Sequence, residues 1–143
     1  MSAAGEPCMV SDVLVNKAAI IERCLARVLE EYRGHEGDFD KDFTRQDSVI
    51  LNLQRACEAS IDAAMHLVRI NKLGVPQESR DAFSMICGAG IIDAALRDRL
   101  QAMVGFRNIA VHDYRKLNLD IVRSIIETRL EDFRAFVTTV LKI

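Results

Sequence analysis

Apolar residues recur every three or four positions along most of this chain, which is the spacing of one face of an α-helix. The first such stretch begins near Ser11 or Asp12, whose short side chains are common helix N-caps, and ends near Tyr32. A polar loop with two glycines follows at residues 34–38, and residues 1–10 precede the pattern, so we expect them to form a flexible N-terminal tail. The apolar positions of this first predicted helix are Leu14, Ala18, Ile21, Leu25, Val28 and Tyr32.

A second periodic stretch runs from Thr44 to Asn71 and predicts a helix about 40 Å long. Thr44 with Asp47 three residues later resembles a capping box, in which two side chains satisfy free backbone N–H groups at a helix start. The glycine and proline at residues 74–76 end this pattern, and a short third helix is predicted over residues 79–86. The apolar face of the second helix is formed by Ile50, Leu53, Cys57, Ile61, Ala64 and Val68.

Two further helices follow. The fourth begins near Ile91, after two glycines, and the last begins after Asn118, which is a suitable N-cap. The last helix has the most regular apolar face of the chain, formed by Val122, Ile126, Leu130, Phe133, Val137 and Val140. We therefore expect one all-α domain over residues 1–143, an up-and-down bundle of four long helices and one short helix.

The composition agrees with a helical domain and limits its partners. A chain of 143 residues is long enough to bury an ordinary core, and seven Gly and two Pro are too few for an architecture of sheets and turns. The formal net charge of −2 excludes a surface that attracts nucleic acid everywhere, so any phosphate site must be local. No segment approaches the roughly 20 apolar residues of a membrane span, and the N-terminus lacks the regions of a signal peptide, so we expect no membrane association.

The four cysteines, Cys8, Cys24, Cys57 and Cys87, do not have the spacing of a metal or redox motif. Three of them lie within the helical patterns beside apolar residues, which favours buried and reduced thiols. We therefore expect a protein of the reducing cytoplasm that uses neither a metal nor another cofactor.

The fourth predicted helix ends in the sequence GFRNIAVHDY, residues 105–114, where a charged residue interrupts the apolar face. That face consists of Ile92, Leu96, Leu100, Met103 and Ala110. Arg107 stands on the same face between the last two, and a buried guanidinium is costly unless something pairs with it. Asn108 and His112 are four residues apart on a neighbouring face, and Tyr114 follows. Polar side chains thus gather at one helix end, which we take as the candidate site.

Arg107 and His112 are residue types that suit phosphodiester cleavage without a metal. Histidine titrates near neutral pH, so it can take a proton from a ribose 2′-hydroxyl or give one to the leaving oxygen. Arginine offers a planar fork to phosphate oxygens and stabilises the charge that develops on them, and Asn108 is a candidate to orient either group. Arg107 and His112 are five positions apart, about 140° around a continuous helix, so a shared substrate requires the helix to end near Val111.

A purely structural interpretation of the same residues stays open. An arginine at a helix end can cap carbonyl groups, a histidine can be held in a tertiary contact, and Tyr114 can be a half-buried packing residue. The local charge favours an anion site to a modest degree, because the segment from Arg97 to Arg123 has six basic and three acidic residues in an otherwise acidic chain. Within it, Arg115 and Lys116 are candidate contacts for RNA phosphates.

The spacing of Arg107, His112 and Tyr114 resembles the R-x4-H-x-Y motif of HepT-like proteins, which belong to the HEPN group of helical bundles. Residues 61–66, 79–83 and 90–92 also read like that family, and the resemblance extends from about Asp12 to the C-terminus. The sequence does not depart from the motif at any of its positions.

The resemblance implies a HEPN-like fold and the toxin of a bacterial toxin–antitoxin pair. Such a toxin is a metal-independent ribonuclease in which two copies of the motif face each other across a homodimer. Arg107 and His112 would be its catalytic residues. Its usual partner is a minimal nucleotidyltransferase antitoxin that transfers AMP to the motif tyrosine, here Tyr114, beside the site for RNA phosphate.

A second function class remains possible for the same sequence. In it, the chain is a dimeric module that binds a nucleotide or RNA without catalysis and holds a nucleotidyltransferase. The intact Arg107 and His112 favour the ribonuclease, because a scaffold requires neither residue, whereas the absence of a long basic surface slightly favours the binding module. Nothing in the residue pattern indicates which RNA is bound or cut.

Overall fold

The computed structural model describes residues 2–143 of the chain, with side chains from Asp12 onward. Every regular element in this part is helical, so the predicted all-α fold is confirmed. The helices are α1 (Ser2–Tyr32), α2 (Phe43–Ile70), α3 (Ser79–Gly88), α4 (Ala94–His112), α5 (Leu119–Thr128) and α6 (Leu130–Leu141). A short 3-10 turn, η1 (Tyr114–Lys116), lies between α4 and α5.

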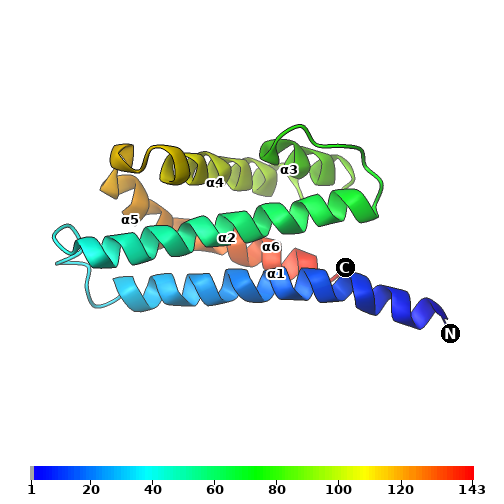
Figure 1. Ribbon diagram of the computed structural model, residues 1–143, viewed down its shortest axis with the longest axis horizontal. Coiled ribbons are helices and arrows are strands. Elements are labelled where there is room, and N and C mark those ends of the chain that lie inside the picture. The colour runs from blue at the N-terminus through cyan, green and yellow to red at the C-terminus, as the bar shows by residue number, and fades with distance from the viewer. Residues whose placement is uncertain (1) are drawn as a thin grey trace.

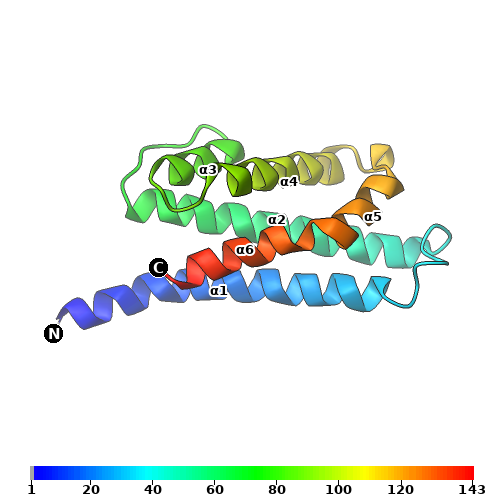
Figure 2. The same cartoon turned by 180° about the vertical axis from the view of Figure 1, so that it is seen from behind.

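The bundle is built on α1 and α2, which form a long antiparallel pair along the whole molecule (Figure 1). α3 and α4 pack on α2, and α6 packs against α1, α2 and α4 (Figure 2). The core between these helices holds large side chains with almost no exposed surface: Leu53, Leu67, Phe83, Phe133 and Phe136. The rings of Phe83 on α3 and Phe136 on α6 meet edge to face with their centroids 5.9 Å apart.

The apolar faces predicted from helical spacing are the buried faces of the structure. The predicted residues of α1, α2, α4 and the C-terminal segment are all buried, except for the charged Arg107, which is half-buried. This agreement is expected, because burial of one apolar stripe against neighbouring helices contributes most of the stability of a helix in a globular protein.

Three helix starts differ from the prediction, and one of them is that of α4, which begins at Ala94 and not near Ile91. The N-cap of α2 is Asp42, whose carboxylate accepts a hydrogen bond from the Arg45 backbone N–H at 3.0 Å, so the predicted capping box of Thr44 and Asp47 is wrong. The backbone of α1 continues back to Ser2, upstream of the predicted cap at Ser11 or Asp12. The flexibility expected of residues 1–10 stays a prediction.

The last predicted helix is two helices, because the chain turns at Arg129 between α5 and α6. The hydroxyl of Thr128 donates a hydrogen bond to the Ser124 carbonyl at 2.6 Å, in competition with the backbone N–H groups that continue a helix. α5 thereby leans from α6 toward the end of α4 (Figure 2). The predicted cap Asn118 is confirmed, since its side chain accepts from the Asp120 N–H at 2.8 Å.

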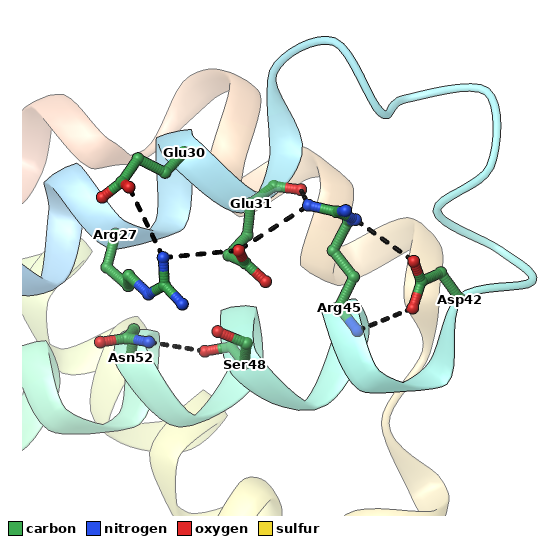
Figure 3. A network of polar contacts seen from close by, with 7 residues as sticks. All are labelled: Arg27, Glu30, Glu31, Asp42, Arg45, Ser48 and Asn52. Carbon is green, nitrogen blue, oxygen red and sulfur yellow. Dashed lines mark hydrogen bonds and ion pairs between the residues drawn. The ribbon is translucent and has the colours of Figure 1, made fainter.

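A network of charged groups holds the start of α2 against the end of α1 (Figure 3). Arg45 donates to the Glu31 carbonyl at 3.0 Å, and its guanidinium lies 3.7 Å from the Glu31 carboxylate and 3.3 Å from Asp42. Arg27 adds contacts to Glu30 at 3.5 Å and to Glu31 at 3.6 Å. The network fixes the first turn of α2, and therefore the direction of the side chains in its second turn.

Two further ion pairs join α4 and α5 to other parts of the bundle. Arg99 of α4 contacts the buried carboxylate of Asp132 on α6 at 2.7 Å. Arg123 of α5 contacts Asp40 at 2.8 Å and donates to the Tyr32 hydroxyl at 3.0 Å, which ties α5 to the loop between α1 and α2. The first half of α4 and the helix α5 are therefore each anchored to another part of the bundle.

Candidate functional site

The candidate site lies where α4 ends and the chain turns through η1 into α5. Asp93 caps the start of α4 by accepting a hydrogen bond from the Leu96 N–H at 2.8 Å, and the helix continues to His112. Asp113 leaves helical geometry with φ −152° and ψ 54°. The helix therefore continues through Val111 and His112, so the end near Val111 that a substrate shared within one chain requires is not present.

Arg107 points from α4 toward the start of α3 and is held by two neutral side chains. Its Nη1 donates to the Asn108 side-chain oxygen at 3.1 Å, and its Nη2 donates to the Ser79 hydroxyl at 3.4 Å. Its Nε is buried without a hydrogen-bond acceptor among the described residues. No acidic side chain in the described part of the chain lies within ion-pair distance of this guanidinium. The positive charge of Arg107 is thus oriented and left uncompensated.

The positive charge of Arg107 acts on the thiol of Cys57, which lies on α2. Burial raises the pKa of Cys57 strongly, and the positive charge of Arg107 opposes the shift without outweighing it. The thiol donates to the Met103 carbonyl at 3.5 Å. Cys57 therefore stays neutral near pH 7 and does not compensate the charge of Arg107. Cys24 is also buried and reduced, as predicted, whereas Cys87 is half-buried and the side chain of Cys8 lies outside the described residues.

His112 is the last residue of α4 and is exposed, with no hydrogen bond to another described residue. α4 is helical through both Arg107 and His112, so these residues lie on different sides of the same helix. No hydrogen bond joins the two side chains within one chain. The fold places both at the same end of α4 without bringing them together.

Tyr114 is the first residue of η1, and its side chain is 44% exposed. Its hydroxyl donates a hydrogen bond to the carboxylate of Asp47 on α2. Burial, this hydrogen bond and the negative charge of Asp47 together raise the pKa of the Tyr114 phenol. Tyr114 is therefore a neutral phenol, held by one acid and open to solvent.

The sequence predicted a different role for Asp47, as the partner of Thr44 in a capping box. It lies in the second turn of α2, freed from capping because Asp42 caps the helix. Its residue spacing places it on the same helix face as Leu51 and Gln54, but nothing in that spacing points to Tyr114. These side chains and Tyr114 line an open cavity of about 380 Å³.

Arg115 and Lys116 occupy the rest of η1, and both side chains are exposed. The ammonium of Lys116 contacts the Asp113 carboxylate at 3.1 Å, which partly compensates its charge. Both residues therefore project from the same turn that carries Tyr114, at the end of α4.

Known proteins are similar to this chain in sequence and in structure. Residues 21–140 match the family model for ribonuclease HepT-like proteins. The chain belongs to the HepT-like family. A relative from Shewanella oneidensis, described as the mRNA nuclease HepT, is 50% identical over 131 residues, which cover 92% of this chain and 98% of the relative.

Solved structures of HepT-like relatives have the same fold. A tri-AMPylated HEPN toxin from Shewanella oneidensis, in complex with an MNT antitoxin, matches with a TM-score of 0.88 and 49% identity, covering 92% of this chain and 98% of that chain. A toxin–antitoxin structure with AMP-PNP matches with a TM-score of 0.86 and 50% identity, covering 90% and 98%. The HEPN-like bundle predicted from the motif is thus confirmed.

None of the helices described here is both long enough and apolar enough to cross a membrane. In the same part of the chain, no three His, Cys, Asp or Glu side chains are grouped so that they could hold a metal ion.

Proposed function

We propose that this chain is the ribonuclease toxin of a toxin–antitoxin pair, a metal-independent endoribonuclease that works in the cytoplasm. Arg107 and His112 are its catalytic residues, and a minimal nucleotidyltransferase silences it by transferring AMP to Tyr114. One observation carries this proposal: an oriented, uncompensated arginine, an exposed histidine and a phenol occupy one helix end of a chain that is half identical to an mRNA nuclease.

Arg107 is suited to bind the phosphate that is attacked. Its side chain is held by Asn108 and Ser79, so little conformational freedom remains to be lost when an anion binds. No carboxylate competes for it in the described part of the chain. A phosphate oxygen would therefore meet a charged fork that stabilises the charge developing on phosphorus during cleavage.

His112 supplies the proton transfers. The reaction is attack of the ribose 2′-oxygen on the adjacent phosphorus, with departure of the 5′-oxygen of the next nucleotide. An exposed imidazole near neutral pH can accept the 2′-hydroxyl proton or protonate the leaving oxygen. The His112 side chain is exposed and makes no hydrogen bond with the described residues, so an RNA strand can approach it.

The active unit in this proposal is a homodimer with one composite cleft. A single chain keeps Arg107 and His112 on different sides of α4. In the proposed dimer, a two-fold axis near the helix end would bring the arginine of one copy beside the histidine of the other. Ile109 and Val111, each 44% exposed, supply an apolar surface next to these residues for a second copy to bury. Arg115 and Lys116 of both copies would contact RNA phosphates around the cleft.

The test is degradation of RNA by the purified protein in EDTA, wild type beside Arg107→Ala and His112→Ala. Each substitution should lower the cleavage rate by about 100-fold or more while circular dichroism and the oligomeric state stay unchanged. His35→Ala, in the loop after α1, is the matched histidine control and should cleave like the wild type. Cleavage by His112→Ala at the wild-type rate would disprove the catalytic assignment, and RNA binding without cleavage by the wild type would select the non-catalytic module.

A further inference from the structure

We propose that Asp47 is the general base that accepts the Tyr114 phenol proton during AMP transfer. The inference rests on the proposed neutralisation of this chain, and it adds a residue of the toxin itself to that reaction. It starts from the hydrogen bond that the Tyr114 hydroxyl donates to the Asp47 carboxylate, across 67 positions of sequence.

The position of Asp47 is set by the fold and serves no structural need of its own helix. Asp42 caps α2, and the Arg45 network fixes its first turn, so the second turn that carries Asp47 has a defined direction. Asp47 forms no ion pair with the described residues, and its side chain is exposed. Its one hydrogen bond in that part of the chain is the bond to Tyr114.

The phenol needs such a base. A tyrosine of ordinary pKa, about 10, is ionised in only about one molecule in 1,000 at pH 7, and the surroundings of Tyr114 raise its pKa further. Attack by a pre-formed phenolate is therefore disfavoured, and the proton must leave while the new bond forms. A carboxylate already bonded to the hydroxyl is placed to receive it, as an aspartate does for the attacking hydroxyl in protein kinases.

The step balances with a nucleoside triphosphate held by the partner transferase. The Tyr114 oxygen attacks the α-phosphorus, an oxygen–phosphorus bond forms, and the bond from that phosphorus to the bridging oxygen of the β-phosphate breaks. Pyrophosphate leaves, and the phenol proton passes to Asp47 and then to solvent. The open cavity beside the pair, about 380 Å³ in volume, gives the incoming phosphate access to the hydroxyl.

The transfer of AMP also removes the hydrogen bond between Tyr114 and Asp47. The product ester has no proton to donate to Asp47, and its phosphodiester carries a negative charge next to that carboxylate. The phosphodiester and the Asp47 carboxylate carry like charges and repel each other. The attached AMP should therefore turn away from α2 toward the basic side chains of Arg115 and Lys116, which lie on the same turn as Tyr114.

The experiment measures the rate of AMP incorporation by intact mass, with the partner transferase and ATP in excess. Asp47→Asn keeps an oxygen that accepts the phenol hydrogen bond but cannot take the proton, so its rate should fall by about 100-fold. Its residual rate should rise about tenfold per pH unit, because reaction then depends on the ionised phenol. Asp62→Asn, an exposed aspartate of the same helix that contacts Lys17, is the matched control and should react like the wild type.

Each outcome decides a separate question. Modification of Asp47→Asn at the wild-type rate, with the wild-type pH profile, overturns the role of Asp47, and faster modification shows that Asp47 restrains the phenol instead. If the wild type itself takes up no AMP, the proposed neutralisation fails and the role of Asp47 with it. The melting temperature of Asp47→Asn, expected near that of the wild type for an exposed side chain, separates a lost base from a lost fold.

Discussion

The guanidinium of Arg107 on α4 donates a hydrogen bond to the hydroxyl of Ser79, the first residue of α3, at 3.4 Å. The contact joins residues 28 positions apart and aims the arginine toward the surface where α3 meets α4. Together with the bond from Arg107 to Asn108 at 3.1 Å, it makes the direction of the guanidinium a property of two helices.

Ser79→Ala should lower the rate of RNA cleavage without unfolding the protein. The lost hydrogen bond involves a charged group but is long, so we expect a loss of about 1 kcal/mol, or roughly three- to tenfold in rate. Ser84→Ala is the matched control, because the Ser84 hydroxyl accepts from Gln101 on the same α3–α4 boundary and does not touch Arg107. Equal rates for both variants would show that Ser79 does not position the arginine.

Tyr114→Phe should separate cleavage from neutralisation. The phenyl ring keeps the packing of Tyr114 but loses the atom that would receive AMP, so RNA should be cut at the wild-type rate and the partner transferase with ATP should no longer stop it. Intact mass before and after incubation is the measurement. Incorporation of AMP into Tyr114→Phe at the wild-type level would place the modification on another residue.

Asp47→Asn should lower the pKa of Tyr114. The phenol pKa is raised by burial first, then by the hydrogen bond to Asp47 and the charge of its carboxylate, and the substitution removes the charge while leaving an acceptor. Tyrosinate absorbance reports this directly, since the chain has two tyrosines and no tryptophan. Tyr114→Phe supplies the titration of Tyr32 alone, and an unchanged difference curve would mean that the carboxylate does not act on the phenol.

The raised pKa values of the two tyrosines predict that the folded protein loses stability at alkaline pH. The pKa values of Tyr32 and Tyr114 are both raised in the folded protein, that of Tyr32 by burial and by its bond to Glu127. A raised pKa contributes stability that is complete below the ordinary value of about 10 and is lost as the pH rises through the folded value. Urea unfolding between pH 8 and about 11 should show this decline, and a double substitution to Phe should reduce it.

Asp93→Ala tests how firmly the helix that carries the site is anchored at its start. The Asp93 carboxylate caps α4 through the Leu96 N–H, so its loss should cost about 1 kcal/mol in urea unfolding. Asp98→Ala, one turn further along the same helix, removes an exposed carboxylate whose one ion pair among the described residues is with its neighbour Arg97. This substitution should change stability by less than about 0.5 kcal/mol.

Sequence reasoning was most accurate where the governing interaction is local or periodic. The apolar faces of α1, α2 and α4 were all predicted, because the helical period assigns each residue to a face whatever the helix packs on. It was least accurate at helix ends. Asp42 and Thr44 are both good caps, and the choice between them depends on the Arg45 network with α1, which a local pattern does not contain.

The amino-acid sequence by itself determined that this chain is a helical bundle, which face of each helix is buried, and that an arginine, a histidine and a tyrosine stand at one helix end. Only the tertiary structure decided which groups those residues meet: Ser79 for Arg107 and Asp47 for Tyr114. The reason is physical. Spacing along a helix fixes direction around its own axis, whereas a contact across 28 or 67 positions depends on how separate helices pack, and that is set by the whole core at once.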